Sequence, residues 1–425
     1  MENRKKLFNL SKVCLAFMLA FVFSIAISNT SEAATLGKPT NLKQIYGSYD
    51  TNSKKYLIGL EYNGVADAYC YLAQISIDNK TWKFADEAYK ETNFFIDDYN
   101  YKPLSAGSTY YVRIIPVSDE KGTYNIDDAS ASIQVVTAPA AVSKIKQTKA
   151  GNNSITASWS GVANATGYNV YVKKSDDSTY TLNGSTKSSS YKLTKYKGSK
   201  LKNDSDYYVG VYATKTSTEG FTAVSLPSKG YLLHTLPSKI TKVAGTNWKP
   251  GKSTLKVSWK KTNTADGYEL QFYNAKGKSI KKATTKKNAY SFTKAPKESS
   301  CSVKIRPYIK LSNGKKTYGK WSKKFYFLSQ ADMSYTTYTI GYGHLTLRWK
   351  AVTGASKYTI YAGTTENNMK AVGTVNGSTT SYTISKISGS TVSPSGCYYV
   401  KVVPQKKLGG KTVKGDYGYY WTLEP

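Results

Sequence analysis

Four stretches of the chain repeat one spacing of aromatic and small residues, and this repeat constrains the fold more than any other feature. Each stretch begins with an aromatic residue, has alanine six positions later and tyrosine nine positions later. The aromatic residues are 97, 100 and 90 residues apart, which is the size of one small β-sandwich domain. We therefore expect four tandem domains of similar structure. The repeated residues are Tyr62, Ala68 and Tyr71; Trp159, Ala165 and Tyr168; Trp259, Ala265 and Tyr268; Trp349, Ala355 and Tyr358.

The residues around these positions alternate between apolar and polar, as β-strands do. In residues 255–259 (LKVSW) and 268–272 (YELQF) every second side chain is apolar, so one face of each strand is predicted to face a core. No sustained helical period follows residue 33. The sequence therefore predicts an all-β protein. A further apolar strand recurs at residues 110–114, 207–211, 301–305 and 398–402.

This ordered set of residues resembles the fibronectin type III family, and in particular the bacterial secreted or surface proteins that contain such domains. In that family strand B carries a tryptophan, strand C a tyrosine, and strand F the pattern Tyr-x-Val-x-Val, whose first residue makes a tyrosine corner. The resemblance covers nearly all of the chain after residue 33 and implies immunoglobulin-like β-sandwiches. Two positions depart from the family pattern: Tyr62 stands where the family has tryptophan, and Cys301 stands where it has the corner tyrosine. The core residues implied by the resemblance are Tyr62, Tyr71, Tyr110, Trp159, Tyr168, Tyr207, Trp259, Tyr268, Cys301, Trp349, Tyr358 and Tyr398.

The ends of the strand patterns set the expected domain boundaries. We predict fibronectin type III-like domains at residues 34–138, 139–236, 237–330 and 331–425, named the first to the fourth repeat below. The segments between them contain no long Gly/Ser tract of the kind that makes a flexible tether. We therefore expect the domains to form an extended, semi-rigid rod.

Residues 1–33 have the pattern of a secretory signal peptide. Basic residues at positions 4–6 precede an apolar run at 13–27, and residues 31–33 (SEA) offer a cleavage point. The apolar run is too short and too close to the start for a mature membrane span. We predict a secreted protein that begins at Ala34, has no transmembrane span, and is extracellular or bound non-covalently to the cell wall.

Cysteine and histidine are too sparse for a disulfide framework or a zinc site. Cys70, Cys301 and Cys397 fall in three different repeats, so we expect free thiols, with an intermolecular disulfide as the alternative. His234 and His344 are the only histidines, and no zinc-ligand cluster surrounds them.

The sequence also lacks the known motifs of catalytic, cofactor-binding and metal-binding sites. There is no histidine-based triad, nucleophile elbow, phosphate-binding glycine loop or metal motif. We therefore expect no catalytic, cofactor-binding or metal-binding residues, and no enzymatic activity. Acid pairs at 97–98, 127–128 and 176–177 are expected to be solvated loop carboxylates, with a loop calcium site as the alternative.

Charge is distributed very unevenly among the repeats. The third repeat has 23 Lys and Arg against three Asp and Glu, which gives +20 of the formal net charge of +33. The first, second and fourth repeats carry −3, +8 and +6. A strongly positive field concentrates anions near it, so we expect a polyanionic partner: an anionic cell-wall polymer or an acidic polysaccharide, and no specific nucleic acid. The alternative is that the lysines keep a tyrosine-rich β-protein soluble and protect its edge strands.

Strand alternation predicts a basic face on the third repeat. If the large apolar residues of 268–272 and 301–305 point inward, the residues between and after them point outward on neighbouring strands C and F. Aromatic rings beside cations suit sugar rings that carry anionic groups, whereas the alternative is tyrosine–cation pairs that only stabilise the sheet. The candidate polyanion-binding residues are Tyr273, Lys281, Lys282, Lys286, Lys287, Lys304, Arg306 and Tyr308.

Fold and charge together predict a non-catalytic extracellular binding or adhesion protein that engages an anionic polymer through the third repeat. Two alternatives stay open. A protein-binding adhesin would contact surface proteins through exposed loops or tyrosines, with weaker dependence on salt. A structural spacer would have no ligand of its own.

Overall fold

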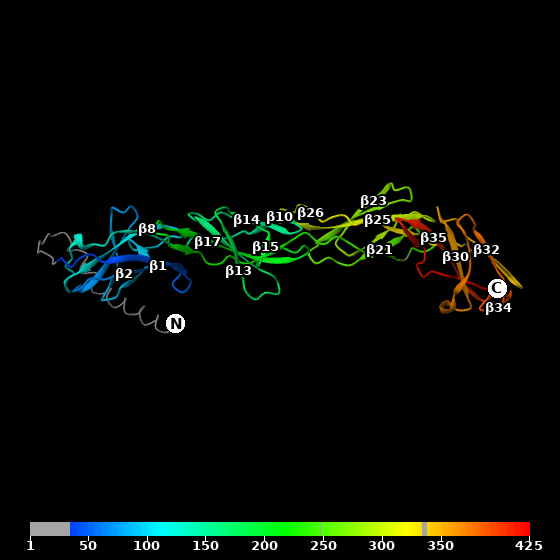
Figure 1. Cartoon of the computed structure of the whole chain (residues 1–425), viewed down its shortest axis with the longest axis horizontal. Helices are drawn as coiled ribbons and strands as arrows, with labels where there is room; N and C mark the ends of the chain where they lie inside the picture. Colours follow the sequence, from blue (N-terminus) through cyan, green and yellow to red (C-terminus); the bar gives the residue numbers. More distant parts are fainter. Residues whose placement is uncertain (1–34, 247, 334–337) are drawn as a thin grey trace. The chain divides into compact units, whose positions relative to one another are not determined.

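The structure, a computed structural model, describes residues 35–246, 248–333 and 338–425 (Figure 1). The predicted signal peptide lies outside these residues. Within them the only helical elements are the two short 3-10 helices η1 (Ile126–Asp128) and η3 (Glu366–Asn368), and all other regular elements are β-strands. The protein is therefore all-β, as the alternating pattern predicted. The described residues include no helix of the length and apolarity needed to cross a membrane.

The first repeat contains two antiparallel sheets that enclose one core. Its strands are β1 (Thr40–Asp50), β2 (Lys55–Asn63), β3 (Cys70–Ser76), β4 (Lys83–Ala88), β5 (Asn93–Ile96), β8 (Thr109–Val117), β9 (Ile133–Val136) and the short hairpin β6 (Asp98–Tyr99) and β7 (Lys102–Pro103). The sheets have the orders β1-β2-β5 and β4-β3-β8-β9. Ile58 and Leu60 of β2 pack with Val112 and Ile114 of β8, and all four are fully buried.

The second repeat has the same arrangement of sheets. Its strands are β10 (Lys146–Gly151), β11 (Ser154–Ser158), β12 (Gly167–Lys173), β13 (Thr181–Thr186), β14 (Ser190–Leu193), β15 (Lys195–Tyr196), β16 (Ser199–Lys200), β17 (Asp206–Thr216), β18 (Thr222–Val224) and β19 (Tyr231–His234). The sheets have the orders β10-β11-β14 and β13-β12-β17-β18, with β19 also on β17. The Gln147 side chain exchanges two hydrogen bonds with the backbone of His234, of 2.6 and 3.0 Å, and so ties β10 to β19.

The third repeat carries the candidate site. Its strands are β20 (Val243–Thr246), β21 (Leu255–Trp259), β22 (Gly267–Tyr273), β23 (Ser279–Thr285), β24 (Ala289–Phe292), β25 (Ser300–Lys310), β26 (Lys316–Tyr318) and β27 (Phe325–Leu328). The sheets have the orders β20-β21-β24 and β23-β22-β25-β26, with β27 also on β25. Leu255 and Val257 of the first sheet pack against Leu270, Phe272 and Val303 of the second.

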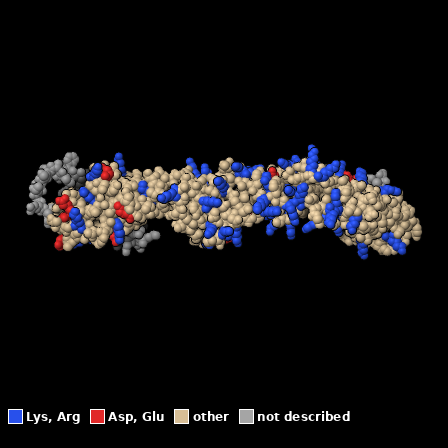
Figure 2. All heavy atoms as spheres, turned by 45° about the horizontal axis from the view of Figure 1, so that its top comes forward, with Lys and Arg blue, Asp and Glu red and all other residues tan. Residues whose placement is uncertain are grey.

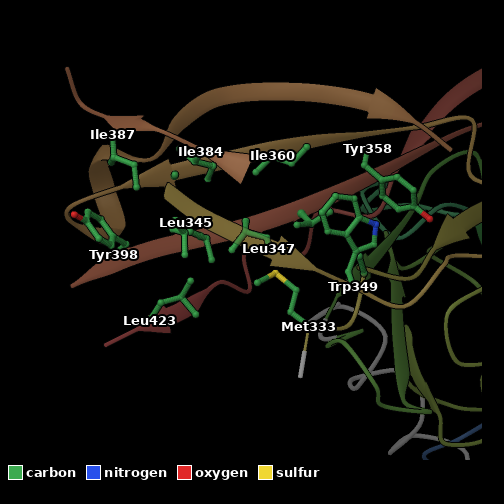
Figure 3. Packing of buried hydrophobic residues seen from close by; sticks show 14 of the residues in the cluster. Met333, Leu345, Leu347, Trp349, Tyr358, Ile360, Ile384, Ile387, Tyr398 and Leu423 are labelled. Carbon is green, nitrogen blue, oxygen red and sulfur yellow. The ribbon is translucent and has the colours of Figure 1, made fainter. Parts of the chain in front are cut away.

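The fourth repeat shows the packing between its two sheets most clearly (Figure 3). Its strands are β28 (Tyr338–Gly341), β29 (His344–Arg348), β30 (Lys357–Gly363), β31 (Lys370–Asn376), β32 (Ser381–Ile384), β33 (Lys386–Ile387), β34 (Ser390–Thr391), β35 (Tyr398–Leu408), β36 (Lys411–Lys414) and β37 (Trp421–Leu423). The sheets have the orders β28-β29-β32 and β31-β30-β35-β36, with β37 also on β35. In the core, Leu345 and Leu347 lie among Trp349, Ile360 and Tyr398.

The described residues form two compact units. The first runs to Val142 and includes Gly161–Tyr168 and Tyr212–Pro227. The second consists of Ser143–Ser160, Asn169–Val211 and Ser228–Pro425. The sheets of the third and fourth repeats therefore belong to one unit.

The repeated tyrosine of each stretch fixes the loop that precedes its strand. Its hydroxyl accepts a hydrogen bond from the backbone N–H six residues earlier, with donor–acceptor distances of 2.8, 3.0, 3.0 and 2.8 Å for Tyr71, Tyr168, Tyr268 and Tyr358. A buried phenol needs such a partner, because an unpaired hydroxyl in a core is costly. The tyrosine at the ninth position therefore has two structural roles: its ring packs in the core, and its hydroxyl fixes the preceding loop. All twelve core residues named from the sequence are buried, with at most 6 % of their surface exposed.

Three of the four repeats have the tyrosine corner. The hydroxyls of Tyr110, Tyr207 and Tyr398 accept hydrogen bonds from the backbone N–H five residues earlier, at 3.3, 3.2 and 2.9 Å. In the third repeat both halves of this contact are missing, since Cys301 takes the place of the tyrosine and Pro296, five residues earlier, has no N–H.

Another tyrosine reaches the core beside Cys301. Tyr417, between β36 and β37 of the fourth repeat, packs against the core cluster of the third repeat, which contains Cys301 and Trp248. The ring centroids of Tyr417 and Trp248 are 6.3 Å apart. Burial raises the pKa of Tyr417, and the nearby Cys301 thiol adds to this rise. Burial also raises the pKa of Cys301 to about 12, so the thiol stays protonated. The fourth repeat thus supplies an aromatic ring that the third repeat lacks.

Asp86 makes the stability of the first repeat depend on pH. Burial raises the pKa of Asp86 to about 6, and Asp97 adds to this rise. The folded state therefore favours the neutral acid, and its stability falls as the pH rises from about 4 through 6. We expect Asp86→Asn to stabilise the first repeat by about 2 kcal/mol at pH 7 and to flatten this dependence. Hydrogen exchange of peptides from residues 55–117, corrected for intrinsic exchange rates, measures both effects, and a variant with the pH profile of the unchanged protein would contradict the assignment.

Candidate polyanion-binding surface

The outer face of the sheet formed by β23, β22, β25 and β27 carries a row of basic residues. Lys282 of β23 is paired with Gln271 of β22, which is paired with Lys304 of β25. Because Phe272 next to Gln271 is fully buried, Gln271 and the two lysines paired with it point away from the core. The pairing of Val303 with Phe325 places Lys324, just before β27, beside Lys304. We name Lys282, Lys304 and Lys324 the lysine row.

A tyrosine borders this row, but one of its faces is already occupied. The ammonium nitrogen of Lys324 lies 4.4 Å from the centroid of the Tyr273 ring, a cation–π contact. The predicted outward position of Tyr273 is therefore correct, and its ring is half-buried. The contact holds the Lys324 side chain over the sheet, close to Lys304.

Arg306 lies on the same face, but its charge is neutralised. Its Nε donates a hydrogen bond of 2.5 Å to Glu269, the residue paired with it on β22. The guanidinium also lies over the rings of Tyr318 and Trp321, at 3.9 and 4.5 Å from their centroids. An arginine that contacts one carboxylate and two aromatic rings stabilises the contacts between neighbouring strands. It contributes little to capture of an external anion.

The prediction that the Tyr308 ring is exposed is wrong. Tyr308 does alternate with Lys304 and Arg306 along β25, yet only 4 % of its surface is accessible. Tyr318 packs edge-on against it at 5.9 Å, and the ammonium of Lys316 lies 4.5 Å from its ring centroid. Strand alternation gives the face of a side chain, but it does not reveal that a neighbouring strand covers that face.

The remaining candidate lysines do not join the row. Lys281 is paired with Phe272 and so lies on the opposite face of edge strand β23 from Lys282, although it is exposed. Lys286 and Lys287 are exposed in the turn after β23. From the candidate set, the structure brings together Tyr273, Lys282 and Lys304. Lys324 is not among the residues predicted from the sequence, although it directly precedes the strand that pairs with β25.

The third repeat has almost no acidic residues to neutralise its lysines. Among its described residues, the contact between Arg306 and Glu269 is the only ion pair. Figure 2 shows blue basic side chains on the third repeat, whereas most of the red acidic side chains on that face belong to the first repeat. Unpaired, partly exposed ammonium groups repel one another and attract anions.

One member of each acid pair has a structural contact, and the expectation that the pairs are solvated is wrong for Asp128, which is buried. Asp97 forms an ion pair of 2.7 Å with Lys55, Asp128 accepts a hydrogen bond of 2.9 Å from the Leu36 backbone, and Asp177 contacts Lys197 at 3.2 Å. No group of three His, Cys, Asp or Glu side chains that could hold a metal occurs in the described part of the chain. Within the chain, the described cysteines Cys70, Cys301 and Cys397 form no disulfide with one another.

The comparison with known families decides the type of the second repeat. Residues 140–230 match the family model of the fibronectin type III domain. The chain contains a fibronectin type III domain. Fibronectin type III domains are commonly extracellular binding or scaffold modules, and tandem arrays of them are typically non-catalytic.

Solved structures with fibronectin type III domains are similar to the chain. The FN1–FN3 domains of chicken CNTN1 share 14% identity with it at a TM-score of 0.28, and the alignment covers 69% of this chain and 99% of that one. A two-domain fibronectin type III segment of chicken tenascin shares 18% identity at a TM-score of 0.24, over 46% of this chain and 99% of that one. No curated protein matches the sequence.

Proposed function

We propose that the protein is a secreted, non-catalytic binding protein whose third repeat captures an anionic polymer of the cell wall or an acidic polysaccharide. The observation that carries the proposal is the lysine row on a repeat with 23 basic and three acidic residues. If the lysines served only solubility, no particular arrangement would be needed. Here one strand contact and one cation–π contact hold two of them side by side, Lys304 and Lys324.

The test compares two charge-matched variants of the full chain in binding to isolated bacterial cell walls across a salt series. Lys282→Gln/Lys304→Gln/Lys324→Gln removes the lysine row. Each lysine that faces an anionic surface contributes about 1 kcal/mol, so this variant is expected to bind roughly 100-fold more weakly. High salt should release the unchanged protein, because exposed charges are screened.

The control variant removes the same charge from elsewhere in the third repeat. It carries Lys256→Gln, Lys260→Gln and Lys294→Gln, three exposed residues on or beside the strands of the other sheet. We expect it to bind within about threefold of the unchanged protein, because only distant, screened charges are lost. Equal loss in both variants would mean that net charge, and not the lysine row, governs binding. No loss in either would refute the proposal.

One observation favours the second candidate, a protein-binding adhesin. Of the 15 large hydrophobic residues that are exposed in the described part of the chain, ten belong to the first repeat. Phe95 and Tyr46 form an edge-on pair there at 6.1 Å, with 53 % and 37 % of their surfaces exposed. Such side chains suit contacts with a surface protein. Binding of that kind would withstand salt and would not need the lysine row.

A further inference from the structure

The hairpin between β35 and β36 of the fourth repeat lies against the outer face of the third. A Cβ atom added to Gly409 at the hairpin tip would be 2.5 Å from a ring atom of Tyr326 in β27, so only glycine allows this approach. Tyr326 is paired with Ser302, which is paired with Tyr273. Tyr326 therefore shares the face of the lysine row and lies two residues after Lys324.

The same hairpin is basic. Lys407 and Lys411 are exposed and lie two residues before and after Gly409, so their Cα atoms are within about 7 Å of it. Within the described residues of the fourth repeat, neither forms an ion pair. Lys407 is paired with Thr412 and Lys411 with Leu408, so the two lysines lie on opposite faces of the hairpin, one on each side of the tip that contacts Tyr326.

Contacts on several sides fix this junction. Besides the Tyr417 ring, the Gln330 amide donates a hydrogen bond of 2.5 Å to the Tyr419 carbonyl. The Thr353 backbone N–H also donates a hydrogen bond of 2.9 Å to the Glu298 carbonyl. These contacts hold the fourth repeat, and with it the hairpin that carries Lys407 and Lys411, against the third repeat.

Two tyrosines of this face, Tyr273 and Tyr326, have ring faces that are occupied by other residues of the protein. Lys324 covers one face of Tyr273, and the Gly409 backbone packs on Tyr326. Stacking on sugar rings needs free aromatic faces, which this surface offers poorly. The lysines act as hydrated point charges, which attract an anion without demanding a planar partner. Such a surface suits a ligand that presents several charges along its chain better than one that offers sugar rings for stacking.

We propose that the lysine row and the hairpin residues Lys407 and Lys411 form one binding surface for a linear phosphodiester polymer that crosses from the third repeat to the fourth. The inference rests on the proposed function and specifies its ligand class. Lys282 and Lys324 are three strand intervals apart, about 14 Å at the usual spacing, and the hairpin extends the surface further. A ligand must therefore carry several charges in sequence, and inorganic phosphate cannot bridge the surface.

The experiment measures affinity of the full chain for glycerol phosphate oligomers of 3 to 12 units at low salt. Lys407→Gln/Lys411→Gln is compared with Lys370→Gln/Lys386→Gln, which removes two exposed lysines from other strands of the fourth repeat. We expect affinity to rise steeply with oligomer length in the unchanged protein. The hairpin variant should bind the 12-unit oligomer at least about tenfold more weakly and the 3-unit oligomer nearly as well, and the control variant should change neither by more than about twofold.

The outcomes separate this inference from the proposed function. If the hairpin variant binds the long oligomer normally while the lysine-row variant loses binding, the two-repeat surface is refuted and the proposed function stands. If neither variant loses binding, both fail. Oligogalacturonates of equal charge serve as the second ligand series. Tighter binding of these carboxylate sugars than of glycerol phosphate would overturn the assignment to phosphodiester polymers.

Discussion

Replacing Tyr417 with alanine is expected to destabilise the third repeat, although residue 417 belongs to the fourth. The ring packs into the core cluster around Cys301 and Trp248 and is largely withdrawn from water. Loss of a buried aromatic side chain costs about 3–5 kcal/mol, and a partly buried ring lies at the lower end of this range. Hydrogen exchange of peptides from residues 255–273 and 300–310 should therefore accelerate.

Tyr342→Ala is the matched control for this prediction. Tyr342 also belongs to the fourth repeat, and 80 % of its surface is exposed. We expect exchange in the third repeat to be unchanged in this variant, because no core contact is lost. The prediction for Tyr417→Ala would be refuted if exchange accelerated only in peptides of the fourth repeat.

Cys301→Tyr, which restores the residue found in the other three repeats, is expected to destabilise the protein. Tyr417 already packs beside Cys301, so a second ring overfills the core at a cost of about 1–3 kcal/mol. The new hydroxyl would also lack its usual donor, since Pro296 has no N–H. Chemical denaturation followed by hydrogen exchange of the third repeat measures the loss.

The double variant tests whether the two rings compete for one space. In the Tyr417→Ala background, Cys301→Tyr should cost at least about 1 kcal/mol less, because the cavity left by Tyr417 can accept part of the new ring. Cys301→Ala serves as the control, since it enlarges no side chain in either background. Equal costs of Cys301→Tyr in both backgrounds would show that the two residues do not share a space.

Local pattern was sufficient for the fold class and for the core. Strand alternation depends only on the two-residue period of extended backbone, so Leu270 and Phe272 could be assigned to the core from the sequence, and both are fully buried. The repeated tyrosines were recognisable by spacing alone. The hydrogen bonds of their hydroxyls to the backbone N–H six residues earlier could not be predicted, because a spacing does not show which polar group a hydroxyl contacts.

The candidate surface was only partly predictable for the same reason. The sequence by itself determined that the third repeat is strongly basic and that Lys304 points outward from its strand. Only the tertiary structure decided that Lys324 lies beside it, that Glu269 neutralises Arg306 and that Tyr308 is covered. These outcomes depend on strand pairing and on packing between strands, such as that of Tyr318 against Arg306 and Tyr308. The sequence pattern, in contrast, records only what each strand presents on its own two faces.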